Sequence, residues 1–121
     1  MKIKIEVEVS DQRAGDLLCS AFEGGSNYWY FIEQVSPSSA GAYYHEKPFD
    51  HNGWVKIRTL EHEEVNGQLE WLLDRAACER GLTLMAEKYP THWSDFISEN
   101  DDATTGDVYL QCCIFGEVVY G

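Results

Sequence analysis

The sequence predicts an α+β fold, in which a small antiparallel sheet is covered on one face by three or four helices. Two stretches indicate the sheet: residues 2–9 alternate apolar and charged side chains, and residues 54–73 resemble a hairpin around the pair Asn66-Gly67. Other stretches place apolar residues at helical spacing. Because only one alternation of strand and helix is clear, parallel βαβ winding is disfavoured.

The size of the chain predicts a single domain spanning residues 1–121. Hydrophobic residues make up 44% of the chain, which is sufficient for an ordinary core, and proline occurs only three times. A chain of this length should bury roughly two-thirds of the surface that its unfolded form exposes. Intrinsic disorder is therefore not expected, despite the high net charge.

The N-terminal strand is expected to face the core with four apolar side chains, at Ile3, Ile5, Val7 and Val9. Ser10 or Asp11 should then cap a helix. The buried stripe of that helix is formed by Ala14, Leu17, Leu18, Ala21 and Phe22. Gly24 and Gly25 are expected to end it, because glycine readily adopts the left-handed conformation favoured at helix C-termini.

The central part of the chain alternates between regular and irregular segments. Residues 28–35 fit either a strand or a short helix, and residues 36–41 read as a loop. Residues 43–53 contain two histidines, a proline and an Asn-Gly pair, which indicates an irregular surface segment. A strand over 54–60 and a returning strand over 69–73 complete the expected hairpin.

The C-terminal part is predicted to be helical. Asp74 should begin a helix that Pro90 ends or interrupts, and a short helix should follow from about Thr91. Thr104 and Asp107 fit a loose variant of a capping box.

The stretch 108–115 is apolar nearly all round and should be central to the fold. Its composition favours a buried helix ended by Gly116, although a buried strand fits the same pattern. With the N-terminal helix and the 74–88 helix, this segment should supply most of the core.

The charge of the chain is strongly negative: nine Lys and Arg oppose 21 Asp and Glu, giving a net charge of −12. Such a field repels nucleic acid and anionic membranes, so direct binding to either is not expected. A basic surface of another protein is a better partner, although acidity also serves solubility.

Two acidic groups would carry such an interaction. If a rigid body displays these carboxylates, they would imitate a phosphate backbone. Alternatively, the carboxylates only keep the surface solvated and cap helices, and no partner is involved. The first group comprises Asp95, Glu99, Asp101, Asp102 and Asp107, and the second comprises Glu61, Glu63, Glu64 and Glu70.

The four cysteines include no C-x-x-C pair, and no signal peptide or membrane-spanning stretch is recognisable. These features predict a protein of a reducing cytoplasm with buried thiols, either a monomer or a homodimer. A catalytic thiol needs electropositive surroundings, but the segment around Cys112 and Cys113 lacks Lys and Arg. We expect no enzymatic activity, no catalytic residues and no cofactor.

Four consecutive aromatic residues, from Tyr28 to Phe31, follow a Gly-Gly-Ser-Asn turn. Asn27, Tyr28, Trp29 and Tyr30 would form a stacking platform for a nucleotide or another small ligand, or else Trp29 and one tyrosine fill the core. Histidines and carboxylates gather at His45, Glu46, Asp50 and His51, with His62 and His92 further on. Their spacing matches no standard metal-ligand pattern, so no metal site is predicted.

Three phrases carry a resemblance to a known family: EGGSNYWY at 23–30, GLTLMAEKYPTHWSDFISENDDATTGDVYLQ at 81–111 and FGEVVYG at 115–121. They resemble a family of small uncharacterised acidic proteins encoded by bacteriophages and prophages. The resemblance implies a setting in the cytoplasm of a bacterial host but no catalytic residues. Acidic proteins of such origin include anti-CRISPR proteins and DNA mimics, which inhibit host defence.

The sequence therefore leads to two hypotheses. In the first, the chain is an acidic interaction protein that inhibits a nucleic-acid-binding or defence protein of the host by covering its basic surface. In the second, the chain is a small-ligand or nucleotide-binding module built on Tyr28, Trp29 and Tyr30.

Overall fold

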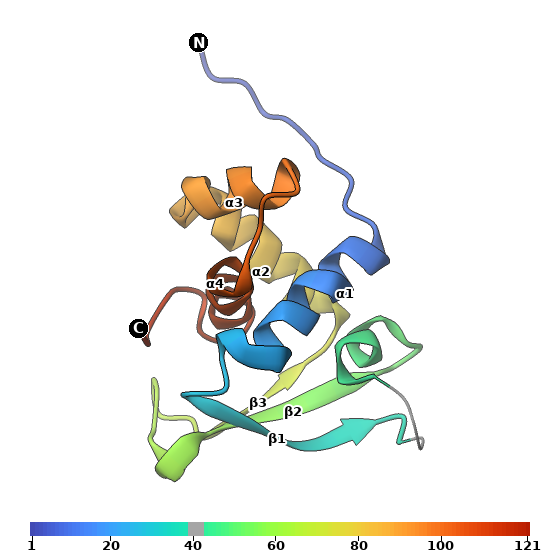
Figure 1. The fold of residues 1–121 in the computed structure, drawn as a ribbon, viewed down its shortest axis with the longest axis vertical. Coiled ribbons are helices and arrows are strands. Elements are labelled where there is room, and N and C mark those ends of the chain that lie inside the picture. Colours follow the sequence, from blue (N-terminus) through green and yellow to red (C-terminus); the bar gives the residue numbers. More distant parts are fainter. Residues whose placement is uncertain (39–42) are drawn as a thin grey trace.

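The computed structural model describes residues 1–38 and 43–121, and it has the α+β architecture that the sequence predicts. The first half contains α1 (Asp11–Ser20), η1 (Ala21–Gly25), β1 (Tyr30–Ser36), η2 (Tyr44–Phe49), β2 (Trp54–Thr59) and η3 (Leu60–His62). The second half contains β3 (Glu70–Leu73), α2 (Arg75–Lys88), α3 (Pro90–Ile97) and α4 (Ala103–Phe115) (Figure 1). Part of the predicted 36–41 loop lies outside the described residues.

The sheet is antiparallel, with β2 between β1 and β3. The predicted hairpin is confirmed, since Ile57 on β2 lies opposite Trp71 on β3. At its tip Asn66 and Gly67 both have positive φ, 52° and 79°, as a tight hairpin turn requires. The ambiguous segment after Tyr28 is a strand, and the register of β1 against β2 shifts between Ile32 and Gln34.

The predicted strand over residues 2–9 is wrong for this structure. The segment forms no ladder with any described residue, and its N-terminal end is drawn out beyond the helices (Figure 1). The third strand of the sheet is instead β1. Alternation predicts which side chains would share a face of a strand, but it does not supply the hydrogen-bonding partner that a strand needs.

The predicted helix starts are largely confirmed by their capping bonds. Ser10 Oγ accepts the N–H of Arg13, and Asp74 Oδ1 accepts the N–H of Ala77. The capping box assigned to Thr104 and Asp107 is wrong, because the N-cap of α4 lies two residues before Thr104.

The true N-cap of α4 is Asp102, whose Oδ1 accepts the N–H of Thr105 at 3.0 Å. Of the two alternatives for residues 108–115, the structure selects the helix. It ends at Gly116 in the left-handed conformation, φ 81°.

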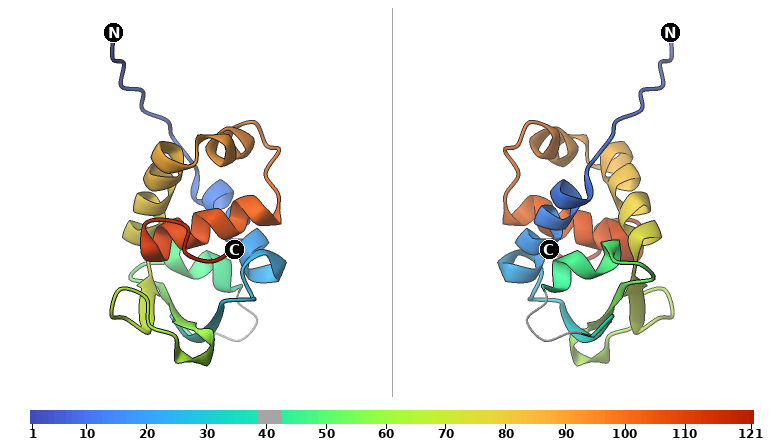
Figure 2. Two further views of the ribbon diagram at one scale, coloured as in Figure 1. Left: turned by 90° about the vertical axis from the view of Figure 1, so that its left-hand side faces the viewer. Right: turned by 90° about the vertical axis from the view of Figure 1, so that its right-hand side faces the viewer.

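The helices lie on one side of the sheet, with α3 farthest from it, as both side views show (Figure 2). Helix α4 lies at the centre, and every residue from Thr105 to Ile114 is buried. Together α1, α2 and α4 supply most of the buried cluster, which confirms that prediction, and β2 adds Val55 and Ile57. Among the described residues, no helix has both the length and the apolar character needed to cross a bilayer.

Candidate functional site

Asp107 on α4 fixes the aromatic turn 26–30 to the body of the protein. Its carboxylate accepts four hydrogen bonds: from Ser26 Oγ at 2.7 Å, Tyr28 OH at 2.6 Å, Trp29 Nε1 at 2.8 Å and Gln111 Nε2 at 3.1 Å. A buried carboxylate is tolerated when its lone pairs are satisfied in this way. The turn therefore has one defined conformation on α4.

Gln111, one helical turn after Asp107, fixes the segment that follows α4. Its Oε1 accepts the backbone N–H groups of Val119 and Tyr120, at 2.7 and 2.8 Å. The ring of Tyr120 then stacks on the indole of Trp29, with 5.6 Å between centroids and 8° between planes. The C-terminal segment thereby closes over the aromatic turn.

Sequence reasoning assigned Asp107 to a helix cap and to the first acidic group, and it overlooked Gln111. Asp107 is instead buried, and its oxygens are occupied by donors of the protein. The spacing of Asp107 and Gln111 could have identified both residues. They lie four positions apart, and so on one face of a helix that is otherwise apolar. Such a pair inside a buried segment must find polar partners, and here the partners come from both ends of the chain.

The four aromatic residues divide between the core and the surface. Trp29 and Tyr30 are only 2% and 5% exposed, whereas Tyr28 is 50% exposed and Phe31 is 39% exposed. Asn27 is also exposed. Trp29 and Tyr30 thus offer no open face for stacking in this conformation, because Phe115, Tyr120 and their neighbours cover them.

Tyr28 lines an open hollow of about 390 Å³, together with Gly24, Thr104, Asp107 and Gly121. Partial burial of the phenol, followed by its hydrogen bond to Asp107, raises the pKa of Tyr28 to about 12. The hydroxyl is therefore a neutral hydrogen-bond donor at ordinary pH, directed at the carboxylate.

The second acidic group lies mainly in a turn at the end of β2, which we call the acidic turn and define as residues 60–64. Glu61, Glu63 and Glu64 are all exposed there. None of the three makes an ion pair within the described part of the chain. Arg58, near the end of β2, pairs with Glu33 at 3.4 Å instead. These three carboxylates are therefore uncompensated.

The acidic turn has an unusual backbone. Glu61 and His62 both have positive φ, 58° and 56°, although neither is glycine. Two hydrogen bonds hold the turn: Leu60 N–H donates to the carbonyl of Trp29 at 2.9 Å, and Thr59 Oγ1 donates to the carbonyl of Glu63 at 2.6 Å. The turn is thus tied to the aromatic turn next to it.

The first acidic group is dispersed by the fold. Asp101 forms an ion pair with Arg13 at 3.2 Å, and Asp102 caps α4. Hydrogen bonds from Thr105, first of all from its backbone N–H, lower the pKa of Asp102. Asp95 and Glu99 remain at the surface, so the group does not present one row of free charge.

The two acidic groups lie at opposite ends of the molecule. The acidic turn adjoins the sheet, whereas the connection from α3 to α4 lies beyond the helices (Figures 1 and 2). A partner that contacted both groups at once would therefore have to span the length of the domain.

The histidines are scattered. His45 lies on η2, His62 lies in the acidic turn, and His92 Nδ1 is 3.2 Å from Thr105 Oγ1. His51 lies beside Asn52, with 3.3 Å between their side-chain nitrogens. Over residues 1–38 and 43–121, no group of three or more His, Cys, Asp or Glu side chains is arranged to hold a metal ion.

The adjacent thiols lie inside the helical core. Burial raises the pKa of Cys112 to about 12, and it also raises the pKa of Cys113. Cys113 contacts the helix α2 face that contains Gly81. These surroundings keep the thiols protonated, which is the opposite of what an activated nucleophile needs.

Comparison of the chain with models of protein families, with curated proteins and with solved structures yields no match.

Proposed function

We propose that this protein is an acidic interaction protein, which covers a basic surface on another protein with its acidic turn. The observation that carries the proposal is the combination of three exposed, uncompensated glutamates with a strained backbone at Glu61 and His62. Charge alone would serve solubility, but strain in the same five residues is not needed for solubility.

Backbone strain of this kind has a cost. A residue other than glycine in the left-handed region costs roughly 1–2 kcal/mol, and Asn or Asp is the usual exception. Glu61 gains no such local compensation, and it is followed at once by a second positive φ. Strained residues gather at binding sites, where the surrounding structure holds them in a required geometry.

The hydrogen bonds of the turn support the same proposal. Thr59 and Trp29, which hold the turn, are both buried in the domain. The three carboxylates therefore start from a fixed frame, which reduces the conformational entropy lost on binding. The net charge of −12 would also attract a basic partner over long range and so raise the association rate of the two proteins.

The partner would be a protein with a groove lined by Lys and Arg, of the kind that binds a nucleic-acid backbone. The resemblance to phage and prophage proteins suggests a host protein in the bacterial cytoplasm, and a defence protein in particular. In that setting the chain would act as an anti-CRISPR protein or another DNA mimic does, by occupying the groove.

The test is capture from a bacterial lysate by the tagged protein, at low and at high salt. E61Q/E63Q/E64Q is compared with D16N/E23Q/E46Q, whose three carboxylates are also exposed and whose change in net charge is the same. We expect a partner whose capture weakens at high salt and in the first variant, but not in the second. Equal loss in both variants, or binding indifferent to salt, contradicts the proposal.

A small-ligand module is the second candidate, and the hollow beside Tyr28 favours it. Its ligand would contact Tyr28, Gly24 and Thr104, which line the hollow, and not the buried rings of Trp29 and Tyr30. Asn27 is exposed but does not line this hollow. Titration with a panel of nucleotides, followed by tryptophan fluorescence, tests this candidate. A response that Tyr28→Ala abolishes would support it, and a flat response across the panel would count against it.

A further inference from the structure

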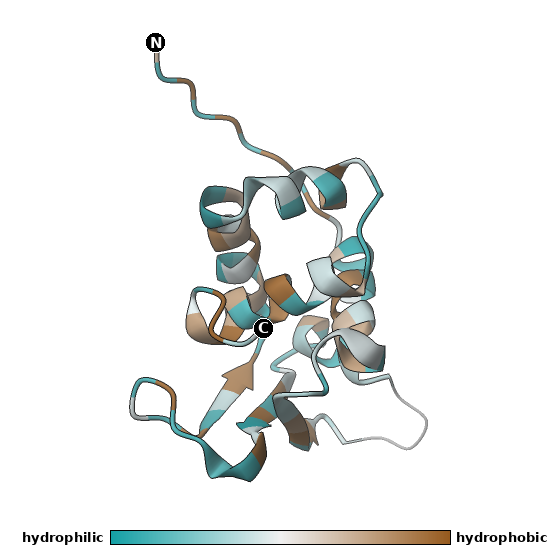
Figure 3. Cartoon of the chain, turned by 60° about the vertical axis from the view of Figure 1, so that its left-hand side comes forward, coloured by the Kyte–Doolittle hydropathy of each residue, from teal (hydrophilic) through white to brown (hydrophobic). Residues whose placement is uncertain are grey.

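The N-terminal segment has the side-chain pattern of a strand, but none of the described strands lies beside it. Ile3, Ile5 and Val7 are 73%, 79% and 51% exposed, and Lys or Glu lies between them. Figure 3 shows the resulting alternation of hydrophobic and hydrophilic residues along the segment. Three β-branched side chains in regular alternation form one apolar face, which is here mostly uncovered.

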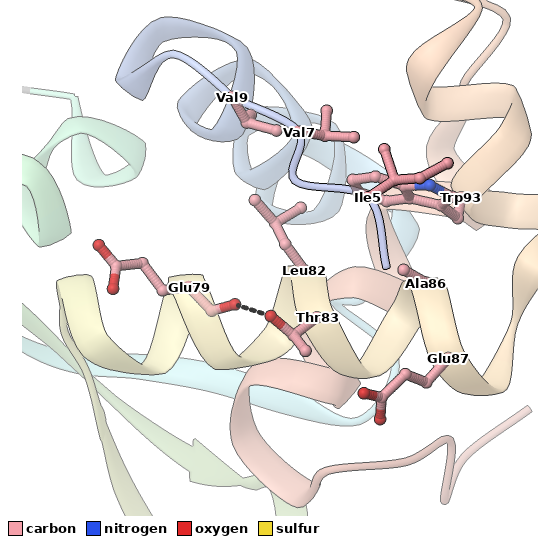
Figure 4. Close-up of a pocket in the computed structure, with 9 residues that line it drawn as sticks. All are labelled: Ile5, Val7, Val9, Glu79, Leu82, Thr83, Ala86, Glu87 and Trp93. Carbon is pink, nitrogen blue, oxygen red and sulfur yellow. Dashed lines mark hydrogen bonds between the residues drawn. The ribbon is translucent and has the colours of Figure 1, made fainter. Parts of the chain in front are cut away.

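That apolar face borders a groove on the helices. The groove, about 620 Å³, is lined by Ile5, Val7 and Val9 from the segment. On the helices its lining is mixed: Leu82, Ala86 and Trp93 are apolar, and Glu79, Thr83 and Glu87 are polar. Figure 4 shows Ile5 above Trp93 and Val7 above Leu82. The segment thus passes over the apolar part of the groove and leaves the groove open to solvent.

We propose that residues 2–9 of two copies of this chain pair as antiparallel strands, with Ile5 of one copy opposite Ile5 of the other. In this register, Lys2 lies opposite the second copy's Glu8, and Lys4 lies opposite its Glu6. By symmetry, each of these oppositely charged pairs occurs twice. Ile3 then lies opposite Val7, so that the apolar residues of both strands share one face.

The charges select this register over its neighbours. A shift by two residues in one direction places Lys4 opposite Lys4, and a shift in the other direction places Glu6 opposite Glu6. Parallel pairing in register opposes every Lys to Lys and every Glu to Glu. Directly opposed like charges destabilise a strand pair, so only one arrangement satisfies all four charged positions.

The groove on α2 and α3 provides the packing surface that an isolated two-stranded ribbon lacks. Such a ribbon is marginally stable in water by itself, and it needs packing against another layer. In the proposed dimer, the second copy's Ile3 lies beside Val7, over the groove of α2 and α3. Leu82, Ala86 and Trp93 would cover the apolar face of the ribbon.

The charge pattern can be tested by reversing charges that should weaken the dimer and then combining the reversals so that pairing is restored. Sedimentation equilibrium of the full chain should show a dimer, and K2E/K4E alone or E6K/E8K alone should raise its Kd on the order of tenfold or more. A mixture of these two variants should form heterodimers. The fourfold swap K2E/K4E/E6K/E8K, which keeps the net charge of the chain, should dimerise like the original protein.

A second test reports the register directly. In a Cys19→Ser background, Ile5→Cys should form an intermolecular disulfide under mild oxidation, because the two positions are opposite one another. Val7→Cys is the matched control, since its two Cα atoms would be roughly 14 Å apart, beyond the ~7 Å that a disulfide spans. We expect cross-linking at least about tenfold faster for Ile5→Cys.

The remaining outcomes overturn the proposal. A protein that is monomeric up to the highest soluble concentration excludes it. So does a dimer that is indifferent to K2E/K4E and E6K/E8K, because that dimer must use another surface. Equal cross-linking at positions 5 and 7 excludes the register. None of these results depends on the acidic turn, so the proposed function is tested separately.

Discussion

The indole N–H of Trp29 donates a hydrogen bond of 2.8 Å to Oδ1 of Asp107, which lies 78 positions later in the chain. The same oxygen accepts Ser26 Oγ, and both donors are buried. This single carboxylate therefore joins the aromatic turn to the central helix. The acidic turn is hydrogen-bonded to the carbonyl of Trp29 through the N–H of Leu60. Asp107 therefore also helps to position the surface that we propose for binding.

Asp107→Ala should lower the free energy of unfolding by about 2–5 kcal/mol, because it leaves the buried donors of Ser26 and Trp29 without an acceptor. Asp107→Asn keeps one oxygen and should lose less. Urea denaturation measures both changes. Asp16→Ala, at an exposed position of α1, is the control and should stay within about 0.5 kcal/mol of the original protein. Equal effects at positions 107 and 16 would refute the role assigned to Asp107.

The stability of the protein should fall between pH 10 and pH 12, in part because of Tyr28. Its pKa is about 12 in the folded protein, against 10.0 for an unperturbed tyrosine. In this interval the unfolded chain loses the phenolic proton while the folded chain keeps it. The stabilising contribution is thus complete below pH 10 and disappears as the pH rises towards 12.

Tyr28→Phe should make that loss of stability with pH shallower. Denaturation curves at successive pH values measure the slope. Spectrophotometric titration of the phenolate should also lose one late-titrating group. Burial raises the pKa of Tyr30, Tyr109 and Tyr120 as well, so part of the slope should persist. An unchanged slope and titration curve in Tyr28→Phe would show that Tyr28 ionises normally.

Gly81→Ala should destabilise the protein by about 1–3 kcal/mol, although alanine favours helices by roughly 1 kcal/mol over glycine. A Cβ at this position of α2 would overlap Cys113 Sγ, and it would lie 2.9 Å from the backbone N and Cα of Cys113. Helices α2 and α4 would have to separate. Thr83→Ala, at an exposed position of α2, is the control and should be neutral or slightly stabilising in thermal denaturation. A stable Gly81→Ala variant would mean that the two helices can separate at little cost.

Glu61→Gly should stabilise the protein by about 0.5–1 kcal/mol, because glycine adopts positive φ without steric cost. Glu63→Gly is the matched control: Glu63 has an ordinary φ of −71°, so this change should destabilise. Chemical denaturation compares the two. If the turn binds a partner, the more stable Glu61→Gly variant should bind it more weakly. Destabilisation by Glu61→Gly would show that Glu61 is not strained.

Local sequence was sufficient for the elements whose signals act over a few residues. Ser10 was one of two candidate caps and Asp74 marked a helix start, while Asn66-Gly67 indicated a hairpin turn and Gly116 a helix end. Each of these effects depends on the residue's own backbone preferences and on neighbours within one turn. The apolar run 108–115 indicated a central element for a different reason, which is also local: side chains of this composition are not stable when exposed to water.

Tertiary structure decided the rest. Whether residues 2–9 join the sheet depends on a partner strand, which alternation cannot specify, and β1 holds that place. Whether Asp107 caps a helix or anchors the aromatic turn depends on donors 78 to 81 positions away. The charge of −12 and the run of glutamates at 61–64 belong to the sequence, but which carboxylates stay unpaired does not. Folding paired Asp101 with Arg13 and left Glu61, Glu63 and Glu64 exposed.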